Sequence, residues 1–99
     1  MVLGKIEMKI PKKVKIGTNT FTVEIVDGDD GIKSCGETNF PALIIKITRG
    51  KQGFMETTFL HEVLHCINNE MGDEHVEFLA QALHGFIQNN KEVFKYGKE

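Results

Sequence analysis

The run His61-Glu62-Val63-Leu64-His65 is the part of this sequence with the clearest chemical meaning. In an α-helix, residues i and i+4 lie on one face about 5–6 Å apart at Cβ, so both imidazoles can reach one metal ion. Glu62 lies about 100° further round the helix, where it can act as general base on a metal-bound water without being a ligand. Zinc lowers the pKa of such a water towards about 7 and polarises a substrate carbonyl. The motif therefore predicts zinc-dependent hydrolysis.

A catalytic zinc held by two histidines needs one more protein ligand, with water in the fourth place. The residues after His65, Cys66-Ile67-Asn68-Asn69-Glu70-Met71, do not continue the HExxHxxGxxH pattern that supplies a third histidine. The candidates further along the chain are Glu70, Asp73, Glu74, His75, Glu77 and His84.

Glu77 is the candidate that we favour as the third ligand. It lies in the first turns of a predicted second helix, between Val76 and Phe78, in a stretch expected to pack on the HExxH helix. The alternative is a glutamate at the rim of an amphipathic helix. His84, seven residues further on the same face, is a candidate transition-state donor or substitute ligand, and its ordinary alternative is a place on the helix face.

The two halves of the chain differ in hydrophobic period, and together they predict an α+β fold. In residues 5–48 apolar and polar side chains alternate, with Gly17-Thr18-Asn19 between the arms of a β-hairpin and a β-branched strand at 43–48. In residues 54–90 the period becomes 3.6, with a first helix ending at Gly72 and a second one N-capped by Asp73. We expect one domain over residues 1–99, a small antiparallel sheet followed by two packed helices that bind the metal.

Composition and charge argue against several other classes of protein. The formal net charge of −2 and the pI near 6.1 give no overall field that favours nucleic acid. No apolar run approaches the roughly 20 residues of a membrane span, and Met1-Val2-Leu3-Gly4-Lys5 lacks a secretory apolar segment. Cys35 and Cys66 cannot form a disulfide framework. We expect a cytoplasmic protein with a protein or peptide substrate, without a membrane or nucleic-acid partner, and leave its oligomeric state open.

The HExxH helix, the helix with Glu77 after it and the small sheet before it resemble the compact zincin-type metallopeptidases encoded by phages and prophages. These are similar to the SprT-like and ImmA-type minimal gluzincin cores. The resemblance covers residues 5–90 and is specific only in the HExxH segment. It implies a zinc metalloendopeptidase with His61, His65 and Glu77 as ligands and Glu62 as catalytic base. One departure is the oxyanion donor, because the single tyrosine, Tyr96, lies in the tail.

A second interpretation places the chain in a different class, a non-catalytic zinc-stabilised domain that binds a protein or DNA partner. Glu62 favours the enzyme, because a structural site has no use for a base beside an open coordination position. Extended peptides often bind as an added strand along a sheet edge. Residues 36–48 are the expected edge, since they lead directly into the metal-binding helix.

Overall fold

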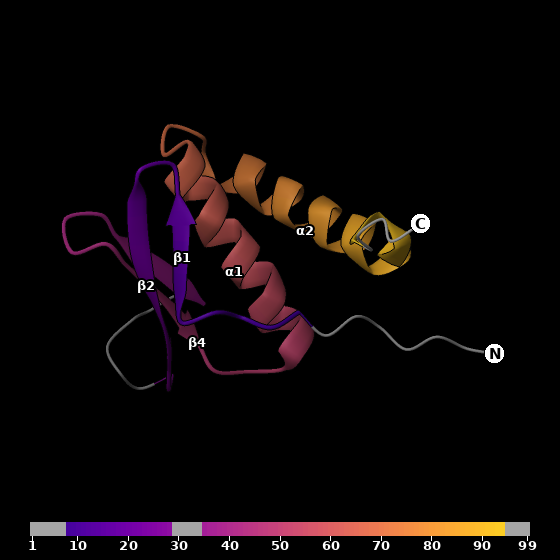
Figure 1. The fold of residues 1–99 in the computed structure, drawn as a ribbon, viewed down its shortest axis with the longest axis horizontal. Helices are drawn as coiled ribbons and strands as arrows, with labels where there is room; N and C mark the ends of the chain where they lie inside the picture. The colour runs from indigo at the N-terminus through magenta and orange to yellow at the C-terminus, as the bar shows by residue number, and fades with distance from the viewer. Residues whose placement is uncertain (1–7, 29–34, 95–99) are drawn as a thin grey trace.

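A computed structural model describes residues 8–28 and 35–94 of the protein, and in them a sheet is followed by two helices (Figure 1). The strands are β1 (Lys13–Ile16), β2 (Asn19–Val26), β3 (Gly36–Asn39) and β4 (Ile44–Thr48). The helices are α1 (Gln52–Ile67) and α2 (Asp73–Asn89), followed by a short 3-10 helix, η1 (Lys91–Phe94). The predicted α+β class is confirmed. The beginning of the predicted alternation, residues 5–7, and the end of the tail, residues 95–99, lie outside the described residues.

The sheet has the order β1-β2-β4-β3. β1 and β2 form the predicted hairpin, and Gly17 in its two-residue connection has a φ of 63°, which glycine adopts without steric cost. β3 and β4 are also antiparallel, but β2 and β4 are parallel, so the sheet is mixed rather than wholly antiparallel. Alternation of apolar and polar residues predicts that a segment is a strand and does not define its direction.

One face of the sheet packs on α1 around a core made by Phe21, Val23, Ile45, Ile47 and Phe59. Ile45 and Ile47 are fully buried because β4 lies inside the sheet, between β2 and β3. β3 is the outer strand on that side and contacts α1 directly. The sheet edge therefore runs beside the helix that carries the HExxH motif.

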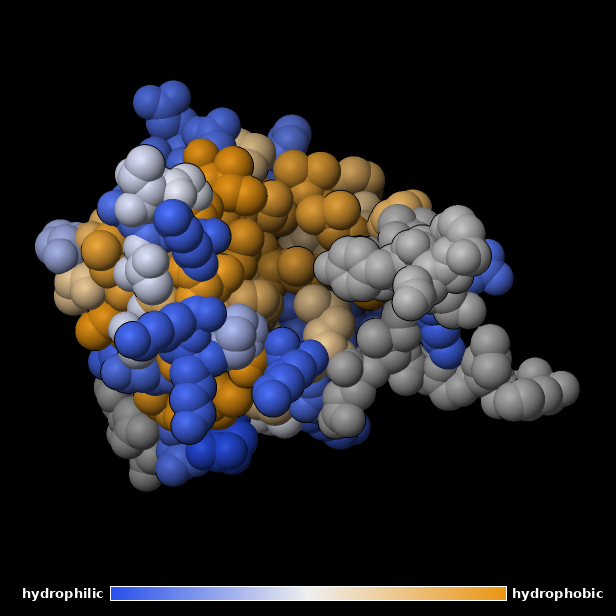
Figure 2. Space-filling model, in the orientation of Figure 1, coloured by the Kyte–Doolittle hydropathy of each residue, from blue (hydrophilic) through white to orange (hydrophobic). Residues whose placement is uncertain are grey.

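Among the described elements, α2 contacts α1 and η1 but no strand, so the sheet, α1 and α2 form successive layers (Figure 1). Val76 and Ala80 are the fully buried residues of α2. Phe78 is 72% exposed, so only one of the two apolar neighbours of Glu77 packs as expected. Figure 2 shows hydrophobic residues gathered over the region that α1 and α2 occupy in Figure 1. Phe78, Leu83 and Phe86 are the large apolar residues that α2 leaves exposed, because it has a single helix to cover.

The turn between the helices differs from the expectation. α1 ends at Ile67, and its C-cap Asn68 is extended and donates its N–H to the carbonyl of Leu64. Gly72 is the N-cap of α2 rather than the end of α1, and Asp73 is the first residue of α2 rather than its cap. Ile67 is 64% exposed, so a longer α1 would gain little burial. The consequence is that the Asp73 carboxylate is available for another partner.

Candidate metal centre

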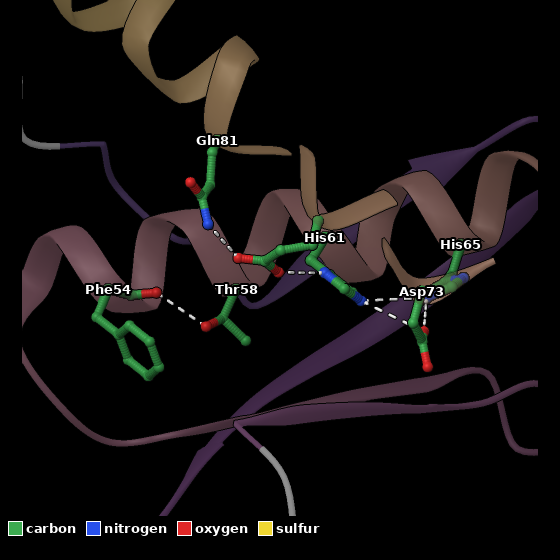
Figure 3. A network of polar contacts seen from close by, with 7 residues as sticks. Phe54, Thr58, His61, His65, Asp73 and Gln81 are labelled. Carbon is green, nitrogen blue, oxygen red and sulfur yellow. Dashed lines mark hydrogen bonds and ion pairs between the residues drawn. The ribbon is translucent and has the colours of Figure 1, made fainter. Parts of the chain in front are cut away.

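The two histidines of the motif meet on one face of α1. His61 Nε2 lies 3.1 Å from His65 Nε2, and both side chains are 18% exposed. Figure 3 shows the two rings directed towards the same point beside α2. The i, i+4 spacing accounts for this convergence, because it stacks the side chains of consecutive turns on one helix face.

Asp73 brings a carboxylate to the same point from the start of α2. Its Oδ1 lies 2.8 Å from His65 Nε2 and 3.7 Å from His61 Nε2 (Figure 3). Within the described part of the chain, these three residues form a group of metal-ligand atoms that lie within 4.8 Å of one another. Sequence reasoning named Asp73 as a candidate but assigned its side chain to helix capping. The signal that it missed is the neighbouring Gly72, which can occupy the cap position itself.

Glu77, the favoured third ligand, lies on the other side of His61. Its Oε1 is 2.9 Å from His61 Nδ1, and its Oε2 accepts a hydrogen bond of 2.6 Å from the Gln81 amide. The hydrogen bond from Gln81 is the main cause that lowers the pKa of Glu77. Burial of the carboxylate opposes this by raising the pKa, and the contact with His61 lowers it further. A carboxylate acceptor at Nδ1 favours the tautomer with a proton there, which leaves a lone pair on Nε2 directed towards His65 and Asp73. Glu77 therefore lies at Nδ1 of His61, and it is Asp73 that lies beside Nε2 of both histidines.

Glu62, the predicted catalytic base, lies between α1 and β3 and is 6% exposed. Thr38 on β3 donates its hydroxyl to Glu62 Oε1 over 2.6 Å. Gly36, two residues earlier on the same face of β3, makes this approach possible. A Cβ there would lie 2.7 Å from Thr58 Cγ2 and 3.3 Å from Glu62 Cγ, so any larger residue would push β3 away from α1. Sequence reasoning placed Gly36 and Thr38 in the expected edge, residues 36–48, but gave neither a role of its own, because strand periodicity alone does not show which helix residue a strand will meet.

His84, the candidate transition-state donor, lies in the C-terminal half of α2 against a buried carboxylate. Its Nε2 is 2.7 Å from Oε1 of Glu56, which is 2% exposed. Gln52 and the backbone N–H of Met8 donate to Glu56 Oε2. Burial acts to raise the pKa of Glu56, but these hydrogen bonds, that of His84 first, outweigh it and lower the pKa. Glu56 ties α1, α2 and the segment before β1 together, and the role of His84 as a donor stays a prediction.

The remaining candidates lie apart from this group. Glu70, Glu74 and His75 are exposed around the turn and the first residues of α2. Cys66, the residue after His65, is half-buried, and burial is the main cause that raises the pKa of its thiol.

A cleft with a volume of about 870 Å³ lies between β3, α1 and α2 and includes the metal-ligand group. α1 lines it with six side chains and α2 with a second row, and β3 forms its third side. The expected edge, residues 36–48, divides in the structure: β3 faces this cleft, whereas β4 lies inside the sheet. His61, Glu62, His65, Glu77 and His84, all predicted site residues, line the cleft together with Asp73.

Comparison with known proteins finds no relative of this chain. The chain matches no protein-family model, no curated protein and no solved structure. Of the helices in the described residues, none is long and apolar enough to cross a membrane.

Proposed function

We propose that this chain is a zinc metalloendopeptidase, a hydrolase in which His61, His65 and Asp73 hold the metal and Glu62 is the catalytic base. The observation that carries the proposal is the convergence of His61 Nε2, His65 Nε2 and Asp73 Oδ1, at separations of 3.1, 2.8 and 3.7 Å, beside a buried glutamate. The same convergence without hydrolysis would describe a zinc-stabilised domain, and the presence of Glu62 favours the enzyme.

The three donor atoms fit zinc. Ligands on a tetrahedral zinc with bonds of about 2.0–2.1 Å lie about 3.3 Å from one another, and the three separations here, 2.8, 3.1 and 3.7 Å, lie on both sides of that value. Two imidazole nitrogens and one carboxylate are a donor set that suits this ion. Glu77 supports the fit, because a histidine that ligates a metal usually donates its other N–H to a carboxylate or carbonyl.

A zinc ion held by His61, His65 and Asp73 would supply a Lewis acid for a peptide carbonyl and a water that is nucleophilic near neutral pH. Glu62 accepts the proton of the attacking water and passes it to the leaving amine. Thr38 holds Glu62 Oε1, so Oε2 is the oxygen that remains for this proton. Burial of Glu62 against β3 prevents the carboxylate from turning out to solvent. β3, as the outer strand beside the cleft, offers an edge along which an extended peptide can lie.

The free cysteines Cys35 and Cys66 agree with the reducing cytoplasm as the place of action. The compact phage and prophage metallopeptidases, which the HExxH segment resembles, remain the class of enzyme that we favour.

Zinc uptake is the experiment that tests the proposal first. We expect near one zinc per chain by mass spectrometry, in protein purified without a chelator or a histidine tag, and near none in His61→Ala. Zinc would also raise the melting temperature of the wild-type chain, because a ligand that binds only the folded state stabilises it. A chain that takes up no zinc, even after incubation with the ion, would contradict the proposal.

The hydroxyl of Thr38 is expected to matter for turnover more than for substrate binding. Thr38→Val keeps the shape of the side chain but leaves Oε1 of Glu62 without its donor, and hydrogen bonds to charged groups are worth about 1.5–3 kcal/mol. We expect kcat to fall by about 10–100-fold, with KM and zinc content unchanged. Thr38→Ser, which keeps the hydroxyl, should stay within a few-fold of the wild type. Equal activity of the valine and serine variants would show that Thr38 is only a packing residue.

A further inference from the structure

The side of α2 that faces away from α1 is apolar along most of the helix. At about 100° per residue, Phe78, Ala82 and Phe86 lie in one row along this side. Leu79 and Leu83 extend the row into an arc of about 140° around the helix. Between Phe78 and Phe86, no polar residue falls within this arc. We call these five residues the outer face of α2.

The outer face of α2 is exposed rather than packed. Of the described elements, α2 contacts only α1 and η1, and Figure 1 shows it as the outermost layer, with α1 between it and the sheet. Phe78 is 72% exposed, Phe86 48% and Leu83 40%. None of the five residues lines the cleft that includes the metal-ligand group. The outer face is therefore separate from the candidate metal centre.

The charges of α2 argue against a membrane as the partner of the outer face. Helices that lie on a membrane surface are rich in Lys and Arg on their polar side. α2 contains neither, and its formally charged residues, Asp73, Glu74 and Glu77, are all acidic. No Asp, Glu, Lys or Arg occurs from Phe78 to Asn90. A contiguous apolar face of this kind, beside an acidic first turn, is typical of a contact with another protein.

We propose that the outer face of α2 binds the same face of a second copy of this chain, antiparallel, about a two-fold axis at Ala82. Phe78, Ala82 and Phe86 form a ridge with a spacing of four residues. Two such ridges pack into each other's grooves at about −50°, the commonest crossing of helices in globular proteins. Ala82, the small residue in the middle, lets the helices approach closely where they cross. Phe78 of each copy then lies beside Phe86 of the other, so the surface is complementary to itself.

The charges at the ends of α2 favour the antiparallel pair over a parallel one. Asp73 and Glu74 form the acidic first turn of α2, and Lys91 follows shortly after its last residue. In the antiparallel pair, the acidic turn of each copy lies towards Lys91 of the other, and opposite charges attract. In a parallel pair the two acidic turns would meet and repel each other. Charge therefore selects the same direction as the ridge.

The exposed apolar area approaches what a specific dimer needs. Burial of a whole phenylalanine removes roughly 200 Å² from water, so the exposed parts of Phe78 and Phe86 amount to about 240 Å² per chain. Two copies bring about 500 Å² from these rings alone, close to half of the roughly 1,000 Å² that a specific interface buries. The rest falls to Leu79, Ala82, Leu83 and the polar rim around them.

Sedimentation equilibrium of the full chain tests the pairing without zinc or a substrate, so the result does not depend on the proposed function. At about 100 μM we expect twice the 11.2 kDa of one chain, falling towards one chain on dilution. Ala82→Glu sets two like charges at the axis and should raise the dissociation constant of the dimer at least about 100-fold. Glutamate is a good helix former, so circular dichroism should show α2 intact. Ala42→Glu, the same change in the exposed turn between β3 and β4, should leave the dimer unchanged.

Oxidative cross-linking tests the direction of the pair. Ala82→Cys places two thiols beside each other at the axis, and we expect a disulfide between the chains. Phe78→Cys alone places its two thiols roughly 12 Å apart along the helix axes, which is too far for a disulfide. It should cross-link much faster when mixed with Phe86→Cys. The wild type controls for the native thiols of Cys35 and Cys66.

Three results would overturn the proposal. A wild type that is monomeric at this concentration would leave the outer face to a different protein. A dimer that Ala82→Glu does not weaken, or that Ala42→Glu weakens as much, would be held by another surface. Failure of Ala82→Cys to cross-link, or equal cross-linking of Phe78→Cys with and without Phe86→Cys, would exclude an antiparallel pair centred on Ala82.

Discussion

Glu62→Gln is expected to abolish most peptide hydrolysis while the chain keeps its zinc. Glutamine has the shape of glutamate and can still accept the Thr38 hydroxyl through its carbonyl oxygen, so β3 and α1 stay together. It cannot take a proton from water, and general bases contribute about 10²–10⁴-fold to rate. We therefore expect kcat to fall by about that factor in a peptide-cleavage assay, with one zinc per chain and an unchanged melting temperature.

Glu24→Gln provides the matched control, because it makes the same chemical change at an exposed position on β2. It should leave hydrolysis unchanged. If the wild type and Glu62→Gln both bind zinc and neither cleaves any peptide, the chain belongs to the class of zinc-stabilised domains. If Glu62→Gln keeps full activity, a different group is the base, and His84 is then the first to examine because it lines the same cleft.

The parts of the site that follow from one helix could be predicted from the sequence. His61 and His65 converge because the spacing of four residues is a property of any α-helix, and the apolar periods in the two halves of the chain predicted the α+β class. The partners from other elements could not be predicted in the same way. Thr38 reaches Glu62 only because Gly36 lets β3 approach α1 closely, and this depends on how the strand lies against the helix.

The identity of the third ligand could not be predicted from the sequence either. Both Asp73 and Glu77 are carboxylates at the start of α2, and their order along the chain does not reveal which one faces His65. The choice depends on where α1 ends. Because α1 stops at Ile67 and Gly72 caps α2, Asp73, the first residue of α2, lies beside His65. Glu77, one turn later, then lies beside Nδ1 of His61. A shift of the turn by about one helical turn would place Glu77 over His65 instead of Asp73.

Asp73→Asn is accordingly expected to lower zinc affinity far more than Glu77→Gln does. Asparagine keeps the size of the side chain and removes the anionic ligand that lies 2.8 Å from His65 Nε2, so we expect a loss of more than about 100-fold in a competition titration with a chromogenic chelator. Glu77→Gln removes a partner of His61 rather than a ligand, and the loss of such a partner typically costs 10–100-fold. A larger loss in Glu77→Gln than in Asp73→Asn would restore Glu77 as the third ligand.

Glu74→Gln is the control that separates ligation from general electrostatics in this comparison. It removes one negative charge from the same first turn of α2, at an exposed position that does not line the cleft. Carboxylates in the first turn of a helix interact favourably with its dipole by about 0.3–1 kcal/mol, so Asp73→Asn and Glu74→Gln lose a similar amount of helix stability. Zinc affinity should stay within a few-fold of the wild type in Glu74→Gln. If it falls as much there as in Asp73→Asn, the Asp73 carboxylate acts through its charge and not as a ligand, and the metal is held by the two histidines with another donor.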